Sequence, residues 1–118
     1  MELCSTNATD VGTNIKRILK DGKVEPAVRR PLGDCIEFYS TALDNVQDAM
    51  EAFRVKDYAT ALSDVGTAGI FADTCKDGFT EFGLDFGPLS KQHDDFFQLV
   101  IISLGIINKI LGRPIILQ

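Results

Sequence analysis

The sequence LGDCIEFYSTALDNVQDAMEAF, residues 32–53, is the most regularly patterned part of this chain and decides its fold. Its large apolar side chains recur at alternating steps of four and three residues, which is the spacing of one face of an α-helix. The members of this face are Leu32, Ile36, Tyr39, Leu43, Val46, Met50 and Phe53, widened on one side by Cys35, Ala42 and Ala49. The segment therefore predicts a long amphipathic helix that packs against other helices.

Three further segments show helical periodicity. They extend from about Leu3 to Lys20, from about Asp57, the expected N-cap, to Phe82, and from Pro88 to Leu111. Their apolar faces comprise Cys4, Ala8, Val11, Ile15 and Ile18; Tyr58, Leu62, Val65, Gly69, Ala72, Cys75 and Phe79; and His93, Phe97, Val100, Leu104, Ile107 and Leu111. The last segment is apolar on most sides, so we expect it at the centre of the bundle.

Three local signals refine these helices. Pro31 lacks a backbone donor, so the sequence predicts a kink or a break at Arg30-Pro31, after an initial turn opened by Pro26. Gly66 and Gly69 lower helix propensity, and their small size would let a neighbouring helix approach closely. Residues 115–118 form a short apolar tail.

Short connections between consecutive helices favour antiparallel neighbours. The predicted fold is therefore all-α, a single domain over residues 1–118 that forms an up-down-up-down four-helix bundle. Cys35 lies near the start of the second helix and Cys75 near the end of the third, so antiparallel packing brings them together. This topology favours a disulfide over two buried free thiols, with Cys4 left over. Closing a loop of about 40 residues is worth roughly 4 kcal/mol in the chain-entropy model.

Charge and hydropathy exclude several classes of partner. The net charge is −5, and residues 34–95 carry 13 Asp and Glu against 4 Lys and Arg, so a nucleic-acid partner is not expected. The longest apolar run, from Leu99 to Ile107, is far shorter than the ~20 residues of a membrane span, so no membrane association is expected. The start Met1-Glu2-Leu3-Cys4-Ser5 shows no signal peptide, whereas a structural disulfide implies an oxidising compartment. A truncated N-terminus would reconcile the two.

Residues with catalytic or metal-binding chemistry do not form a recognisable pattern. His93, the one histidine, falls on the apolar face of the last helix, where it is expected as a satisfied core residue rather than a ligand. No zinc-type spacing, catalytic triad or phosphate loop is present. We therefore expect no enzyme, no cofactor and no metal. Asn7-Ala8-Thr9 is a glycosylation sequon, which makes Asn7 a candidate acceptor only in a secreted protein.

Several local motifs together resemble the plant invertase and pectin methylesterase inhibitor family, including its pollen-allergen-like branch. They are Asp34-Cys35 with Tyr39 one turn on, Lys56-Asp57-Tyr58, Thr74-Cys75-Lys76-Asp77-Gly78-Phe79, and Pro88-Leu89 before an apolar last helix. The resemblance covers about Leu3 to Leu111.

This resemblance implies a bundle whose second and third helices are joined by a Cys35–Cys75 disulfide. It implies a protein of the plant cell wall or vacuole that docks on invertase or pectin methylesterase and blocks substrate access. The candidate partner-binding residues are Asp57, Tyr58, Asp73, Thr74 and Asp77.

The choice of target enzyme stays open. Some invertase-binding members carry Pro-Lys-Phe at the start of the third helix, where this chain has Tyr58-Ala59-Thr60. Thr74 matches pectin methylesterase-binding members and the pollen branch alike. Family members also carry an N-terminal helical hairpin with its own disulfide, which this sequence does not contain. The alternative is a non-inhibitory interaction module or a truncated remnant of the family, of unknown oligomeric state.

Overall fold

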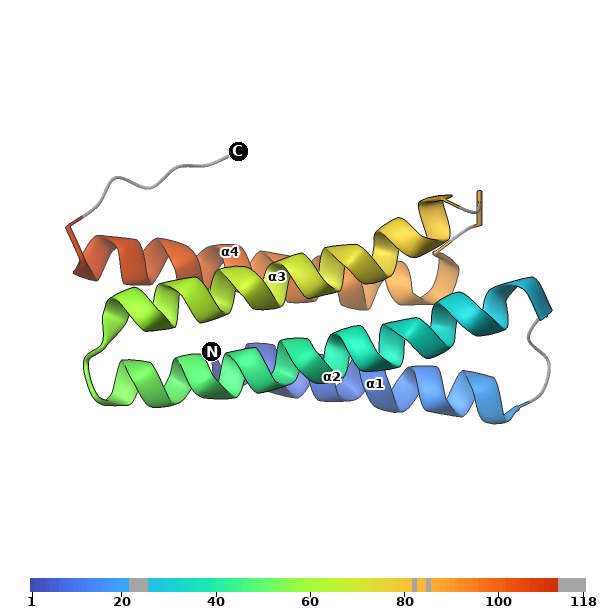
Figure 1. Cartoon of the computed structure of the whole chain (residues 1–118), viewed down its shortest axis with the longest axis horizontal. Coiled ribbons are helices and arrows are strands. Elements are labelled where there is room, and N and C mark those ends of the chain that lie inside the picture. The colour runs from blue at the N-terminus through green and yellow to red at the C-terminus, as the bar shows by residue number, and fades with distance from the viewer. Residues whose placement is uncertain (22–25, 82, 85, 113–118) are drawn as a thin grey trace.

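The fold is an antiparallel four-helix bundle. The computed structural model describes residues 1–21, 26–81, 83, 84 and 86–112. The helices are α1 (Glu2–Lys20), α2 (Pro26–Arg54), α3 (Tyr58–Glu81) and α4 (Ser90–Ile110), with a short 3-10 helix, η1 (Gly87–Leu89), before α4. Figure 1 shows the four long helices side by side, with successive helices reversing direction. The predicted up-down-up-down topology is therefore confirmed, whereas the apolar tail at 115–118 lies outside the described residues.

Pro31 does not break α2, so the break is excluded, whereas the kink at Arg30-Pro31 stays a prediction. The helix begins at Pro26, as expected, and continues through Pro31 to Arg54. The missing donor of Pro31 would have bonded to Ala27, which is in the first turn, so only one backbone bond near the helix end is lost. Pro31 is itself buried, and its packing helps to offset that loss.

The buried faces of α1, α2 and α3 follow the predicted spacing closely. α1 buries Cys4, Ala8, Val11 and Ile15, and α3 buries Val65, Gly69, Ala72, Cys75 and Phe79 with Ala61 and Ala68. In α2 the most buried side is the one that carries Cys35, Ala42 and Ala49, whereas Ile36, Leu43, Met50 and Phe53 are half-buried. Small residues therefore occupy the centre of the α2–α3 contact.

The face predicted for α4 is displaced. His93, Val100 and Ile107 are buried as predicted, but Phe96 and Ser103 are buried in place of Phe97 and Leu104, which are half-buried. α4 is also not enclosed on all sides, because Ile102, Ile106 and Ile110 are 55%, 54% and 46% exposed. A helix with apolar residues on nearly every side has no single face marked by its sequence, so its neighbours decide which face is buried.

The turn between α2 and α3 fixes the start of α3. Lys56 has a left-handed backbone (φ 65°), and the N–H groups of Lys56 and Asp57 donate to the carbonyls of Phe53 and Ala52 at 3.0 and 2.8 Å. This pair of bonds is a Schellman motif. The Asp57 carboxylate then accepts the N–H of Thr60 at 3.3 Å, which confirms Asp57 as the N-cap.

Gly69 is a point of close approach between α3 and α4. A Cβ atom at Gly69 would lie 3.1 Å from Cγ1 of Val100, whereas a Cβ at Gly66 would meet nothing within 4 Å. The close-approach role predicted for both glycines therefore holds for Gly69 only. Within the described residues, no helix is both long and apolar enough to cross a membrane.

Candidate docking surface

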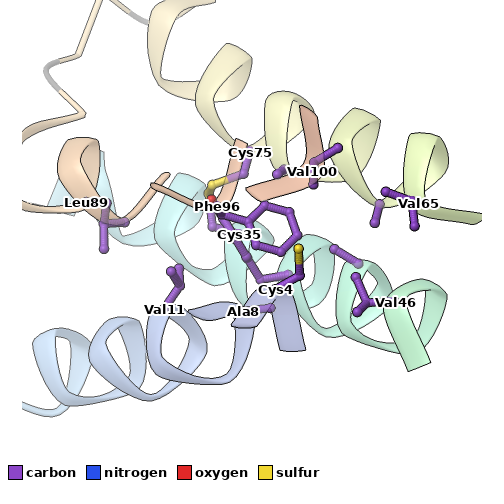
Figure 2. Packing of buried hydrophobic residues seen from close by; sticks show 14 of the residues in the cluster. Cys4, Ala8, Val11, Cys35, Val46, Val65, Cys75, Leu89, Phe96 and Val100 are labelled. Atoms are coloured by element: carbon purple, nitrogen blue, oxygen red, sulfur yellow. A yellow bond between two sulfur atoms is a disulfide. The ribbon is translucent and has the colours of Figure 1, made fainter. Parts of the chain in front are cut away.

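The Cys35–Cys75 disulfide joins α2 to α3, as the topology predicts. The two Cα atoms are 4.8 Å apart and the bond closes a sequence separation of 40 residues. In Figure 2 it is the yellow bond between the labelled Cys35 and Cys75. Both cysteines are 1% exposed. The bond therefore joins α3 covalently to α2 in the second half of α3.

Cys4 is the cysteine left over, and it is buried as a free thiol in α1. Its Sγ lies 3.9 Å from Oγ of Ser103 in α4. Burial raises the pKa of this thiol, because the thiolate would lose its hydration. Cys4 is thus an unreactive core residue in the folded chain.

The five sequence-predicted partner-binding residues all belong to α3 or its N-cap, and they separate into two groups. Asp57 and Tyr58 start the helix, and both have structural contacts: the Asp57 carboxylate caps α3, and the half-buried Tyr58 ring meets Phe53 edge-on with centroids 5.2 Å apart. Asp73 lies 15 residues after Tyr58, about 22 Å along the helix axis. The structure therefore does not bring the two groups together in one patch.

Asp73, Thr74 and Asp77 form the second group, one to two turns before the end of α3. Asp77 is exposed, the Asp73 side chain is 52% exposed, and Thr74 is half-buried. The Thr74 hydroxyl donates to the backbone carbonyl of Ile70 at 2.9 Å. Of the three, the two carboxylates are thus the more exposed groups, and Asp73 lies on the flank of α3 that faces α4.

Sequence reasoning missed the environment of Asp73. Its Oδ1 lies 3.5 Å from Nε2 of His93 in α4, and Nδ1 of His93 lies 2.9 Å from Oη of Tyr39 in α2. Tyr39 and His93 each fall on a predicted apolar face, and nothing in their own segments indicates that they meet. Burial lowers the pKa of His93, and the nearby Asp73 carboxylate only partly opposes this.

A second acidic group on the opposite flank of α3 was also missed. Burial raises the pKa of Asp64, and the nearby charges of Asp48 in α2 and Asp57 raise it further. Carboxylates on α2 and at the start of α3 therefore act on Asp64, and this side of α3 is acidic. Such a surface is complementary to a partner that presents basic side chains.

Between α2 and α3, two half-buried aromatic rings also reach the surface. Phe38 and Phe71 stack with centroids 6.4 Å apart at an angle of 29°. Aromatic side chains of this kind commonly anchor protein–protein interfaces. They were not among the sequence-predicted candidates, because Phe38 lies just off the heptad face of α2.

Asn7, the candidate glycosylation residue, lies on α1 and is half-buried. It lines a groove between α1 and α4 with Leu3, Asp10, Asp95 and Leu99, and its Oδ1 is buried without a hydrogen-bond partner. Its glycosylation stays a prediction. Among the residues that the structure describes, no three His, Cys, Asp or Glu side chains are placed to hold a metal.

Comparisons with known proteins agree with this architecture. Residues 1–106 match the family described as plant invertase/pectin methylesterase inhibitor. The chain is 40% identical over 110 residues to proteins named "Putative invertase inhibitor" from Platanus acerifolia and Platanus orientalis, a match that covers 93% of this chain. It spans 60% and 64% of the length of those two relatives.

Solved structures resemble the fold. A pectin methylesterase inhibitor from Arabidopsis thaliana superposes with a TM-score of 0.82 at 24% identity, over 91% of this chain and 70% of that one. A mutant form of an Arabidopsis pectin methylesterase inhibitor gives a TM-score of 0.83 at the same identity. At this identity the likeness concerns the fold alone. The match over residues 1–106, together with the two relatives at 40% identity, shows that the chain belongs to the plant invertase/pectin methylesterase inhibitor family.

Proposed function

We propose that the chain is a proteinaceous inhibitor that docks on a plant carbohydrate-active enzyme, invertase or pectin methylesterase, and blocks substrate access without catalysing a reaction. The observation that carries this proposal is the family match over residues 1–106. The names of the two Platanus relatives support it. Because the chain spans less than two thirds of those relatives, inhibition has to be measured for this chain itself.

The surface chemistry of α3 supports docking on a basic partner. Asp73 and Asp77 are exposed on one flank, and on the other the charges of Asp48 and Asp57 raise the pKa of Asp64. The disulfide holds α3 in place, so a partner would meet a preformed surface and little conformational freedom would be lost on binding. We infer that the five candidates, Asp57, Tyr58, Asp73, Thr74 and Asp77, contribute to this surface along the whole length of α3.

Adding purified chain to acid invertase and, separately, to pectin methylesterase at mildly acidic pH tests the proposal directly. We expect one of the two activities to fall at micromolar concentrations or below. Full activity of both enzymes at micromolar chain would contradict the proposal. Local residues and overall resemblance point to different targets, so both assays are needed.

Charge-reversal variants then locate the docking surface. Asp73→Lys and Asp77→Lys on α3 should weaken inhibition, whereas Asp10→Lys, which makes the same charge change at an exposed site of α1, should have little effect. Equal losses for all three variants would indicate a general effect of net charge, and would remove α3 from the proposal.

The second candidate function is a non-inhibitory interaction module of the same fold. It is favoured by one observation, namely that the solved inhibitors resemble this chain at only 24% identity, so that their likeness concerns the fold. It predicts a stable bundle that affects neither enzyme. We also propose an extracellular (apoplastic) or vacuolar location, since a buried structural disulfide requires an oxidising compartment to form.

A further inference from the structure

A series of polar side chains extends from the core of the bundle to the surface of α3. Oη of Tyr39 lies 2.9 Å from Nδ1 of His93, and Nε2 of His93 lies 3.5 Å from Oδ1 of Asp73. Tyr39 is 1% exposed and His93 is 3% exposed, whereas the Asp73 side chain is 52% exposed. One end of the series is thus sealed from water, and the other end belongs to the candidate docking surface.

The chemistry of the three groups fixes where the protons lie. An ionised carboxylate can only accept hydrogen bonds, so Nε2 of His93 carries a proton that points to Asp73. In the neutral ring Nδ1 then carries no proton and accepts a hydrogen bond from the Tyr39 hydroxyl. Burial raises the pKa of Tyr39, and the charges of Asp73 and Asp94 add to this, so the hydroxyl remains a donor. This arrangement gives the Tyr39 hydroxyl an acceptor only while His93 is neutral.

We propose that His93 is a positioning residue that makes the surface carboxylate of Asp73 respond to pH, and with it the affinity of the α3 surface for its partner. The inference rests on the proposed function, because Asp73 is a candidate partner-binding residue. The site is closed by aromatic rings: Phe86 and Phe97 lie with their centroids 5.2 and 6.0 Å from that of His93.

Protonation of His93 changes both ends of the series. The imidazolium ring has two N–H donors and no acceptor, so the Tyr39 hydroxyl loses the acceptor that it has in the neutral state. On the other side, the Nε2–H group becomes a cationic donor and holds the Asp73 carboxylate more strongly. A carboxylate paired in this way is less available to a basic group of a partner. Docking should therefore weaken as His93 takes up a proton.

The charges around His93 come from two helices. On α3, Asp73 raises the pKa of His93 and Lys76 lowers it. Asp94 on α4 also raises this pKa, and α2 contributes the uncharged Tyr39 hydroxyl. Burial is the largest influence, and it lowers the pKa of His93 below its usual 6.5. The unfolded chain therefore binds the proton first as the pH falls. The contribution of neutral His93 to stability is complete above pH 6.5 and is lost as the pH falls through the lower pKa of the folded state.

The chain's single histidine makes the first test direct, because one imidazole NMR signal reports one site. Followed from pH 4 to pH 8, it should titrate below 6.5 in the wild type. Tyr39→Phe should raise the titration midpoint of His93, since the unprotonated Nδ1 loses the hydroxyl that donates to it. Asp73→Asn should lower the midpoint below that of the wild type, since a nearby negative charge is removed.

Matched controls separate these contacts from general effects. Tyr58→Phe removes the hydroxyl of the chain's other tyrosine, at the far end of α3, and Asp77→Asn removes a carboxylate one turn from Asp73. Both should leave the midpoint close to that of the wild type. Equal midpoints for Tyr39→Phe and Tyr58→Phe, or for Asp73→Asn and Asp77→Asn, would overturn the proposed coupling.

The second test concerns docking. Glutamine can donate to Asp73 and accept from Tyr39 as neutral histidine does, but it does not titrate, so His93→Gln should keep the fold and remove the pH response. The dissociation constants of the wild type and of His93→Gln for the inhibited enzyme are measured by surface plasmon resonance at each pH. Their ratio cancels the pH dependence of the enzyme itself. We expect wild-type binding to weaken relative to His93→Gln by up to about fivefold as the pH falls, the size of one exposed charge contact.

The outcomes distinguish this inference from the proposed function. A ratio that stays constant across the titration range would refute the role of His93 in docking, while leaving inhibition itself intact. If the wild type binds neither enzyme, the proposed function and the docking role both fail, and the NMR titration still decides whether Tyr39, His93 and Asp73 are coupled.

Discussion

The helix pairs α2–α3 and α1–α4 each place a cysteine against the neighbouring helix, but only the first pair forms a covalent bond. Cys35 and Cys75 join α2 to α3, whereas Cys4 of α1 meets only the hydroxyl of Ser103 in α4, at 3.9 Å. α1 is also the shortest of the four helices, with 19 residues against 29 in α2. Attachment of α1 therefore depends on the burial of a few side chains, and the candidate docking surface lies on the covalently fixed pair.

Removing the disulfide of the α2–α3 pair should change the free energy of unfolding more than any other variant considered below. The double variant Cys35→Ala/Cys75→Ala should lose roughly 4 kcal/mol of unfolding free energy, because the unfolded chain regains the freedom of a loop of about 40 residues. Urea denaturation followed by circular dichroism measures the loss, and the reduced wild type provides the control. A loss below about 1 kcal/mol would mean that the two pairs are held equally by packing.

Shortening a buried side chain of α1 should have the next largest effect. Ile15 is fully buried, so Ile15→Ala should cost about 2–5 kcal/mol through the cavity it leaves. The matched control is Ile102→Ala, at a side chain that is 55% exposed, which should change stability by no more than about 0.5 kcal/mol. Hydrogen exchange should rise first in α1. Equal acceleration in α3 would show that α1 does not open separately from the α2–α3 pair.

The two ends of α3 offer a smaller and sharper test. Lys56 and Gly83 both have left-handed backbones at φ 65°, in turns with the same hydrogen-bond pattern. Gly83→Ala should therefore cost about 1 kcal/mol, and Lys56→Gly should be neutral or add up to about 1 kcal/mol, since only glycine adopts this conformation without strain. Thermal unfolding of both variants measures this. A loss of stability in Lys56→Gly would show that the Lys56 side chain supplies a contact that outweighs the strain.

The smallest expected effect concerns the boundary between the two pairs, where α3 meets α4. Gly66→Ala should gain up to about 1 kcal/mol from helix propensity, because its Cβ meets nothing within 4 Å. Gly69→Ala should fall short of that gain, because its Cβ would lie 3.1 Å from Val100. Chemical denaturation of the pair gives the difference. Equal gains would indicate that α4 can move away from α3 at no measurable cost.

Much of the fold could be predicted from the sequence because its signals are local. The spacing of apolar residues in α2 and α3, the capping carboxylate of Asp57 and the positions of Cys35 and Cys75 within antiparallel helices each depend on one segment or on helix order. The break at Pro31 did not occur, because the effect of a proline depends on how near it lies to the end of the helix. In the second turn of α2 it removes one backbone hydrogen bond and leaves the helix continuous.

The rest depends on rotation and register between helices, which the sequence does not encode locally. α4 carries apolar residues on nearly every side, so only its neighbours determine that Phe96 rather than Phe97 is buried. The Tyr39–His93–Asp73 series joins three helices, and each member belongs to a segment that explains it without the others. The five candidate partner-binding residues on α3 and its N-cap therefore stay a prediction, and the contact between Asp73 and His93 could not be read from their separate segments.

The buried thiol of Cys4 also makes it possible to measure how often α1 separates from the rest of the bundle. With the other two cysteines oxidised, Cys4 is the one sulfhydryl that a thiol-trapping reagent could label. Since it has essentially no exposure, labelling has to wait until the helix opens. The labelling rate at high reagent concentration would then equal the opening rate, and at low concentration it would report the fraction of open molecules. The labelling of Cys4 could thus be used to compare the opening rate of α1 in the free chain with that in a complex formed on the α2–α3 pair.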